Sequence, residues 1–226
     1  YWVPIMQAIS TKYRTYAIDL WGFGDSGKKP ANYSIDSQVE LIMKFMDHLG
    51  VAKLAFVGHG WGGAVALRFA TQHPELVARL MTINMPLNGA SIKPRFATSN
   101  VSALLDWLVG KVPGSDELFS ETNKLDPVVI QTSLEYMNQT DLTADLNQTN
   151  APTLLVHGEK DEAIVPPSEE GFNGFKPNLH QIMFEGGRHF PMLDDPPKFH
   201  RLLADFLETK DLTALELKDE WKRRMR

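Results

Sequence analysis

A short strand pattern that runs through glycines straight into a helical pattern constrains this chain most. Residues 54–58 read as a buried parallel strand, and residues 61–72 read as the helix that follows it. Glycines at 58, 62 and 63 let helix and strand approach closely. Further strand and helix patterns alternate along the chain, which predicts a doubly wound, mostly parallel α/β sheet whose site lies at the carboxyl ends of the strands.

The residue at the centre of this turn is Gly60, within Val57-Gly58-His59-Gly60-Trp61-Gly62-Gly63. This layout is that of a nucleophile elbow, G-x-Nuc-x-G, which presents an attacking side chain at a sharp strand-to-helix turn. The central backbone conformation costs roughly 1–3 kcal/mol for a residue with a Cβ atom, whereas glycine adopts it easily. Gly60 therefore suits the turn but offers no attacking atom. The alternative is a generic glycine-rich turn, such as one that binds phosphate.

Two later segments present an acid and a base in turn. Residues 152–161 form a strand pattern that ends in a loop carrying Asp161, and residues 182–191 form another that ends in a glycine turn carrying His189. The order of nucleophile position, acid and histidine resembles that of the α/β-hydrolase superfamily. The loop at 19–27 is similar to the loop of that family that follows the strand before the elbow. The resemblance covers residues 1 to about 208.

The resemblance implies a role for each of these residues. Gly60 occupies the nucleophile position, Asp161 that of the acid that orients the imidazole, and His189 that of the general base. The backbone N–H of Trp61 is an oxyanion donor, which survives the presence of glycine at position 60. The string His59-Gly60-Trp61-Gly62-Gly63 resembles that of epoxide hydrolases and haloalkane dehalogenases, which use an aspartate. Serine esterases use a similar string.

Three other residues complete the candidate substrate-binding set. His59 packs or bonds beside the elbow, while Trp107 and Tyr136 come from the segment in which the family places a helical lid. An apolar lid pocket for a small organic ligand is one reading of this segment, and burial of the lid against the core is the other. Epoxide hydrolases activate the epoxide oxygen with lid tyrosines, and this segment holds only Tyr136.

The chain is predicted to divide into four parts. Residues 1–86 form the first part of the core, 87–150 the helical lid, 151–208 the rest of the core, and 209–226 a helical tail. Strands are predicted at 15–20, 54–58, 80–85, 153–158 and 180–184. Helices are predicted at 3–11, 34–49, 61–72, 101–111, 116–124, 126–139, 167–172 and 196–207.

Composition excludes several classes of function. With 226 residues the chain can bury one substantial core, and its net charge of −5 gives no reason to expect a nucleic acid or an anionic membrane surface as partner. The absence of cysteine excludes disulfides and thiol catalysis, and the other ligand-type residues show no metal-site clustering. With no long apolar run, we expect no membrane span. We also expect no cofactor and a cytoplasmic location.

The two ends of the chain carry further expectations. The chain begins at a helix, although strands and a second oxyanion segment come first in relatives, so we expect a fragment. Residues 1–226 produced alone are then expected to be poorly soluble or unstable, because a sheet edge is exposed. The tail from Lys210 to Arg226 has an apolar face and a basic end. It is predicted to be a helix that packs on its own domain or, alternatively, contacts a partner or a second copy.

Three functions fit these patterns, and the sequence leaves open whether Gly60 is native and whether the protein is active. The first is an α/β-hydrolase that acts on or binds a small ester-, epoxide- or haloalkane-like ligand without a covalent nucleophile. The second is a non-catalytic, receptor-like ligand binder of the same fold. The third is a non-covalent enzyme in which Asp161 and His189 act as a base on water or on a substrate C–H or O–H. The retained pair favours the first and third, because a pure binder needs no oriented base.

Overall fold

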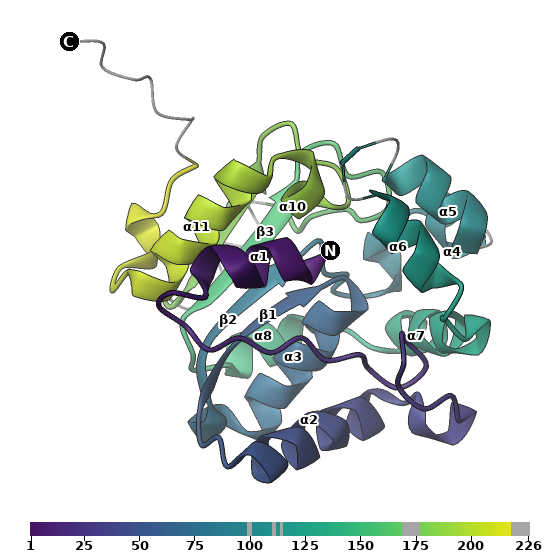
Figure 1. Cartoon of the computed structure of the whole chain (residues 1–226), viewed down its shortest axis with the longest axis horizontal. Coiled ribbons are helices and arrows are strands. Elements are labelled where there is room, and N and C mark those ends of the chain that lie inside the picture. The colour runs from purple at the N-terminus through teal and green to yellow at the C-terminus, as the bar shows by residue number, and fades with distance from the viewer. Residues whose placement is uncertain (99–100, 110–111, 114, 169–176, 218–226) are drawn as a thin grey trace.

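A four-stranded parallel sheet forms the centre of the molecule (Figure 1). The computed structural model describes residues 1–98, 101–109, 112–113, 115–168 and 177–217. The strands lie in the order β1 (Leu54–His59), β2 (Val77–Ile83), β3 (Thr153–Gly158) and β4 (Leu179–Phe184), and every neighbouring pair is parallel. Because the strands are parallel, the segments that follow all four of them meet at one edge of the sheet.

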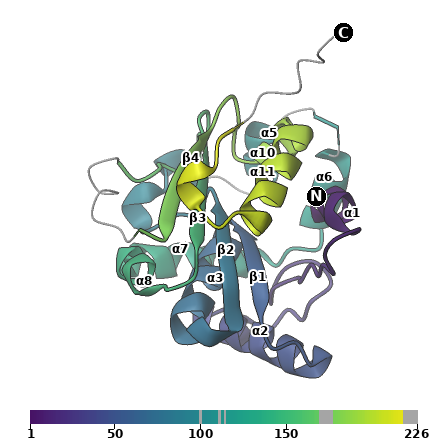
Figure 2. The ribbon, with the colours of Figure 1, turned by 90° about the vertical axis from the view of Figure 1, so that its left-hand side faces the viewer.

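Helices cover both faces of the sheet (Figures 1 and 2). On one face, α3 (Trp61–Gln72) packs against β1 and β2 and is flanked by α2 (Ile35–Leu49) and α8 (Thr143–Gln148). On the other face, α11 (Pro196–Glu208) contacts both α1 (Trp2–Ile9) and α10 (Pro191–Asp194). This two-sided cover explains why all six residues of β3 are buried.

The connection from β2 to β3 is a helical insertion, which we define as residues 87–150. It contains the 3₁₀ turn η3 (Gly89–Ser91) and the helices α4 (Pro94–Thr98), α5 (Val101–Leu108), α6 (Ser115–Thr122) and α7 (Pro127–Gln139), before α8 returns to the sheet. Figure 1 shows α4 to α7 together on one side of the sheet. The short turns η1 (Pro30–Asn32), η2 (Pro74–Leu76) and η4 (Leu212–Ala214) lie elsewhere.

Local chemistry sets the helix ends. The side chain of Ser34 accepts a hydrogen bond from the Ser37 N–H at the start of α2, and Gly50 ends that helix with a φ of 65°. At α11, Asp195 caps the Lys198 N–H and prolines occupy the first helical positions.

The core lies between the sheet and the helices on either side. Its largest fully buried side chains are Tyr33, Phe69, Phe184, Phe199, Phe206, Met46, Leu67, Leu80, Met81, Ile83, Met85 and Met137. Most of them come from the strands and from α2, α3 and α11, whose apolar faces were visible in the sequence as helical and strand periodicities. The predicted bounds of α3 and β3 are confirmed.

The strand predicted at 15–20 is wrong. The segment belongs to no helix or strand, and its side chains alternate near its end, with Ile18 and Leu20 half-buried and Ala17 and Asp19 exposed. The described sheet, however, contains only β1 to β4, so the alternation is present without the pairing. A strand needs a neighbour that supplies hydrogen bonds, and a local pattern cannot guarantee one.

The tail also differs from the prediction. Over residues 209–217 the structure has the single turn η4 in place of an α-helix. Side chains there bond to nearby backbone, since Asp211 accepts from the Thr213 N–H and the Thr209 hydroxyl donates to the Asp211 carbonyl. Such bonds compete with helix formation. The rest of the predicted tail, and most of the helix predicted at 167–172, lie outside the described residues.

Smaller differences concern short elements. The helices α4, α8 and α10 were not predicted, since four to six residues are too few for a clear helical period. Strand β2 begins and ends earlier than the predicted 80–85, because the backbone leaves the extended conformation at Asn84.

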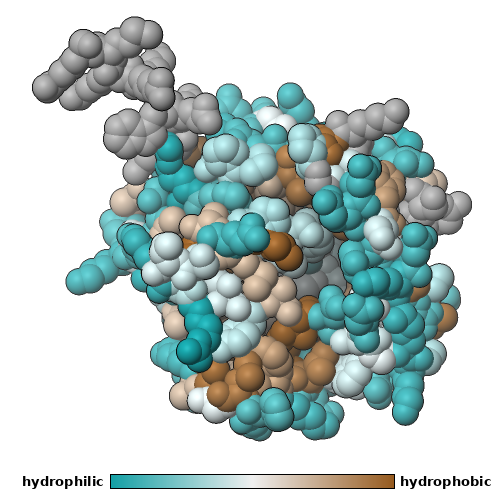
Figure 3. All heavy atoms as spheres, viewed as in Figure 1, coloured by the Kyte–Doolittle hydropathy of each residue, from teal (hydrophilic) through white to brown (hydrophobic). Residues whose placement is uncertain are grey.

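The surface seen in Figure 3 is mostly hydrophilic, with apolar areas scattered over it. The large apolar side chains that are exposed come from separate elements and loops: Val3, Leu49, Val128, Val165 and Met183. Single exposed apolar residues of this kind are normal and do not mark a docking surface. Among the described residues, no helix is long and apolar enough to cross a bilayer.

The contact between β1 and α3 generates a test of the fold. A Cβ atom at Gly58 would lie 2.5 Å from the Gly62 carbonyl oxygen and 2.6 Å from the Gly63 Cα, which are backbone atoms. We expect Gly58→Ala to lower the free energy of unfolding by about 1–3 kcal/mol or more through overpacking. Gly62→Ala is the matched control, because its Cβ would meet nothing within 4 Å. That variant should be neutral or stabilising by roughly 0.5–1 kcal/mol. Urea denaturation measures both, and equal effects would contradict the close approach.

Candidate active site

The loops after β3 and β4 bring the predicted acid and base together. The Nδ1 atom of His189 lies 3.0 Å from Oδ2 of Asp161, and both side chains are buried. The two strands are neighbours in the sheet, so residues 28 apart in sequence leave the same edge side by side. The acid and the base that the resemblance implies therefore lie within hydrogen-bond distance of each other.

The carboxylate of Asp161 is held by backbone as well as by the histidine. Its Oδ1 atom accepts hydrogen bonds from the Ala163 N–H at 2.7 Å and the Ile164 N–H at 3.3 Å. Burial acts to raise the pKa of Asp161, but the hydrogen bond and charge of His189 and these two N–H groups outweigh it and lower the pKa. Asp161 is therefore a carboxylate at neutral pH.

The partner of Nδ1 fixes the tautomer of His189. A carboxylate can only accept, so the proton of the neutral imidazole lies on Nδ1, and Nε2 carries the lone pair. An imidazole oriented in this way can take a proton at Nε2, and the neighbouring carboxylate stabilises the cation that results. The pair thus has the arrangement of a general base and its orienting acid.

Gly60 has a backbone conformation that suits glycine. It follows β1 with φ 52° and ψ −121°, its N–H donates to the Ile83 carbonyl at 2.9 Å, and its carbonyl accepts from the Gly63 N–H at 3.0 Å. The positive φ is costly for a residue with a Cβ atom. Space is no obstacle, because a Cβ atom at this position would meet nothing within 4 Å. The turn can therefore accommodate a side chain sterically.

His59 connects the elbow strand to the loop of the base. Its Nε2 donates to the His189 carbonyl at 2.7 Å, and its ring centroid lies 4.7 Å from those of His189 and Phe190. Tyr1 packs against it edge-on. Burial, with a smaller contribution from His189, lowers the pKa of His59 to about 3. His59 is therefore neutral, which keeps a second positive charge away from His189.

Trp61 and Tyr136 lie together, with ring centroids 5.7 Å apart. The Tyr136 hydroxyl accepts a hydrogen bond from Nη2 of Arg68 at 2.7 Å, and Arg68 also pairs with the buried Asp145 at 3.0 Å. The indole Nε1 of Trp61 is buried without a hydrogen-bond partner among the described residues. Tyr136 thus has its hydroxyl engaged by α3, while Trp61 keeps an unused donor beside Gly60.

Trp107 lies elsewhere, against the loop of the acid. Its Nε1 donates to the Glu162 carboxylate, and the Arg95 guanidinium lies 4.2 Å from the centroid of its ring. Beside it, Lys93 Nζ donates to the Asp161 carbonyl at 2.6 Å. The structure gives no contact between Trp107 and the Asp161–His189 pair, so its predicted place in substrate binding stays a prediction.

Sequence reasoning missed Asn84, which follows β2 with φ 45° and is fully buried. Its side chain contacts the loops of both the acid and the base. The only signal in the sequence is an asparagine just after a buried strand, a residue type that tolerates a left-handed conformation. Lys93 was missed as well.

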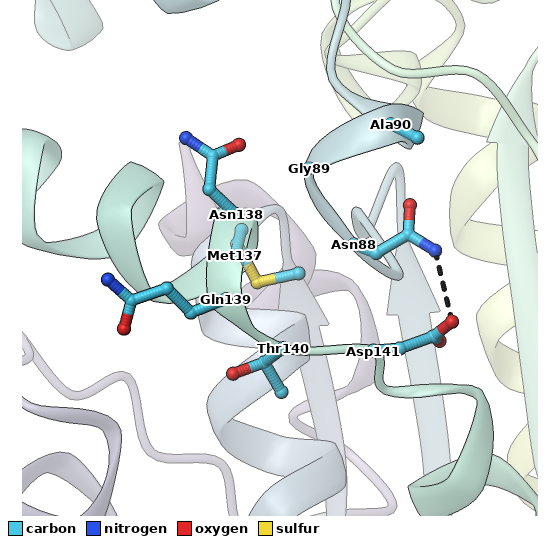
Figure 4. A pocket seen from close by; sticks show the side chains of 8 residues that line it. All are labelled: Asn88, Gly89, Ala90, Met137, Asn138, Gln139, Thr140 and Asp141. Atoms are coloured by element: carbon cyan, nitrogen blue, oxygen red, sulfur yellow. Dashed lines mark hydrogen bonds between the residues drawn. The ribbon is translucent and has the colours of Figure 1, made fainter.

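Two surface hollows lie away from these residues. One of about 410 Å³ is lined by residues of η3 and the C-terminal end of α7, with Asn88 hydrogen-bonded to Asp141 at 3.3 Å (Figure 4). The other, of about 320 Å³, is lined by residues 87, 88, 90, 91, 143 and 165–168. Neither hollow is lined by Gly60, Asp161 or His189. The candidate site is therefore identified by the acid–base pair and the turn at Gly60, and not by the volume of a hollow. Within the described ranges, no group of three His, Asp or Glu residues could hold a metal ion.

Comparisons with known proteins identify the class. The chain belongs to the α/β-hydrolase fold family, whose sequence profile matches residues 1–125. It is 25% identical over 229 residues to RutD of Stutzerimonas stutzeri, to which a carbamate hydrolase activity is ascribed, covering 92% of this chain and 86% of that protein. It is 40% identical over 100 residues to epoxide hydrolase 1 of Caenorhabditis elegans, covering 43% and 24% of the two chains.

Solved structures agree on the fold. The crystal structure of a hydrolase from Pseudomonas aeruginosa PA01 matches with a TM-score of 0.78 at 20% identity, over 92% of this chain and 84% of that one. These similarities place the chain in the α/β-hydrolase fold family.

Two histidines, the half-buried His59 and the buried His157, generate a prediction of pH dependence. The pKa values of His59 and His157 are lowered to about 3 and about 4, chiefly by burial, against about 6.5 unfolded. The unfolded chain therefore binds more protons below pH 6.5, and stability should fall as the pH drops from there toward 3. Each group contributes a slope of at most about 1.4 kcal/mol per pH unit, less where its ring is partly exposed.

Urea denaturation between pH 7 and 4 measures this slope. His59→Gln, which keeps a donor for the His189 carbonyl, should flatten the profile. His48→Gln on the exposed end of α2 is the control and should leave it unchanged. A profile for His59→Gln that matches the unsubstituted protein would contradict a neutral His59.

Proposed function

We propose that this protein is an α/β-hydrolase that acts on or binds a small ester-, epoxide- or haloalkane-like ligand, with Gly60 at the nucleophile position and Asp161 and His189 as acid and base. The observation that carries the proposal is the hydrogen bond between Asp161 and His189, at the sheet edge where β1 turns through Gly60 into α3. The relatives named for carbamate and epoxide hydrolysis support a small organic electrophile as the substrate class.

The chemistry that this arrangement supports depends on what attacks the substrate. In a covalent route, a side chain at position 60 would attack the electrophilic carbon, and the backbone N–H of Trp61 would stabilise the oxyanion. Glycine removes the first of these groups and leaves the second. The protein as it stands should therefore form no acyl- or alkyl-enzyme at this position.

A second, non-covalent route is favoured by the open space beside Gly60. A water molecule there could donate a proton to Nε2 of His189 while its oxygen attacks an ester carbonyl carbon. The imidazolium, stabilised by Asp161, would then return the proton to the departing alcohol oxygen. In this route Asp161 and His189 serve as the base that activates water, which gives the buried, oriented pair a function without a side chain at position 60. The insertion would act as the lid over the reacting atoms.

The first test is for a covalent intermediate. Intact-protein mass spectrometry after incubation with activated esters, epoxides and haloalkanes should detect no adduct at residue 60, and stopped-flow traces should lack a burst. Weak turnover fits the proposal, since removal of one triad member leaves roughly 10³–10⁴-fold acceleration over water from the remaining groups. A burst, or an adduct at residue 60, in the unsubstituted protein would contradict it.

Restoring an attacking side chain should reveal the chemistry for which the site is built. Gly60→Ser should raise turnover of activated esters if the site is of esterase type, and Gly60→Asp should raise turnover of epoxides or haloalkanes if it is of that type. The gain should be at least about 10²-fold, the usual contribution of a positioned base to such a step, and should vanish when His189→Ala is added.

The outcomes separate the three functions. A gain that depends on His189 supports the hydrolase site. Rapid turnover by the unsubstituted protein that is lost in His189→Ala supports the water route. If both variants fold, bind a small ligand and stay inactive, the protein is a ligand binder, and the hydrolase proposal is wrong.

A further inference from the structure

One buried side chain contacts the loops of both the acid and the base, and it is not a member of the predicted triad. Asn84 follows β2, has no exposed surface and is the only described residue other than glycine with a positive φ, at 45°. Its backbone N–H donates to the Val156 carbonyl of β3 at 2.9 Å. The backbone of Asn84 is thus fixed to the centre of the sheet.

The side chain of Asn84 uses its amide group at both ends. Its Oδ1 accepts from the Gly158 N–H at 2.8 Å, where β3 ends and the loop of Asp161 begins. Its Nδ2 donates to the Arg188 carbonyl at 3.0 Å and to the His189 carbonyl at 2.8 Å. These partners also fix the orientation of the amide group. The Gly158 N–H requires an acceptor, so the oxygen faces it, and the two carbonyls require a donor, so the NH₂ group faces them.

The positions of these bonds relate them to the site. The Gly158 N–H lies three residues before Asp161, and one of the two carbonyls belongs to His189 itself. The His189 carbonyl receives its second hydrogen bond from Nε2 of His59, on β1. Donors that follow or lie on β1 and β2 therefore hold the backbone of the base. Asn84 bonds to both loops at once, and the Lys160 N–H, which donates to the Gly187 carbonyl at 2.8 Å, joins the same two loops directly.

The strained backbone of Asn84 is an independent observation. A positive φ costs energy for a residue with a Cβ atom, and glycine would remove that cost. Glycine at this position would also remove three buried hydrogen bonds, and the Gly158 N–H and the Arg188 carbonyl would lose their Asn84 partner, while the His189 carbonyl would keep its bond from His59. Only a side chain that tolerates this conformation and both donates and accepts serves all three partners, and asparagine meets both conditions.

We propose that Asn84 is a positioning residue, which sets the relative placement of the Asp161 and His189 loops and so keeps the bond between their side chains. This inference rests on the proposed function for its catalytic meaning but not for its geometry. Asn84 touches neither the reacting atoms nor the two side chains. It acts through the backbone of Gly158, Arg188 and His189.

The proton that His189 Nδ1 shares with Asp161 gives a readout that needs no activity. A hydrogen-bonded imidazole proton appears far downfield in proton NMR, and Asp161→Asn assigns it by its loss. Asn84→Asp keeps the acceptor for Gly158 but turns the donor into an oxygen that faces two carbonyl oxygens. Loss of one net hydrogen bond shifts an equilibrium by about tenfold. We therefore expect the downfield proton to exchange with water at least about tenfold faster, or to vanish.

Asn178→Asp is the matched control. The Asn178 Nδ2 also donates to two backbone carbonyls, those of Ala151 at 2.8 Å and Thr149 at 3.4 Å, but at the opposite end of the sheet, before β3 and β4 begin. This variant makes the same exchange of a donor for an acceptor away from the site, and it should keep the downfield proton. If Asn178→Asp also loses the signal, or if Asn84→Asp retains it, Asn84 does not position the pair.

Two further measurements test the proposal if Asn84→Asp does not fold. Asn84→Gly removes the side chain and its strain together, and we expect the same loss of the downfield signal. In the unsubstituted protein, hydrogen exchange should show the Gly158 amide as protected as its neighbours in β3, and rapid exchange there would overturn the proposal. If the signal behaves as expected while no Gly60 variant gains activity, the proposed function fails and the positioning role stands.

Discussion

The structure depends above all on the close approach of α3 to the first two strands. A Cβ atom at Gly58 would collide with the backbone of Gly62, and one at Gly63 would lie 3.1 Å from the Cβ of Met85. This contact brings the first turn of α3 directly over the end of β1. It places Gly60 at the carboxyl edge of the sheet, with its N–H on Ile83 of β2. Side chains larger than hydrogen would separate helix from sheet and displace the turn.

Around this fixed point, buried polar groups are satisfied by partners from distant segments. Asp161 is nearly inaccessible, and a buried carboxylate costs several kcal/mol unless charges and hydrogen bonds compensate. Here two backbone N–H groups and His189 supply the compensation. The buried carboxylate of Asp145 is likewise compensated, by an ion pair with Arg68 and a hydrogen bond from the Thr71 hydroxyl, both on α3. The candidate site is thus held by the same kind of contact that holds the insertion to the core.

The insertion contributes to the site as well as covering part of the sheet. An isolated bridge joins Ile92 to Ile164, Lys93 donates to the Asp161 carbonyl, and Trp107 bonds to Glu162. These three contacts tie the segments on either side of α4 to the loop that carries the acid. The position of the Asp161 loop therefore depends on the insertion as well as on the strands.

The sequence by itself determined the elements whose signals are local. The glycines and the change from strand to helical period predicted β1, the turn at Gly60 and α3, and the order of the motifs predicted that Asp161 and His189 would meet. Tertiary structure decided what depends on distant partners. The segment 15–20 has the alternation of a strand but is not paired in the sheet that the described residues form. Asn84 takes its role from groups 74 and 105 residues away, and the Tyr136 hydroxyl is engaged by Arg68, 68 residues away. A local pattern records the preferences of a segment, whereas a hydrogen bond across the fold exists only once both partners are brought together.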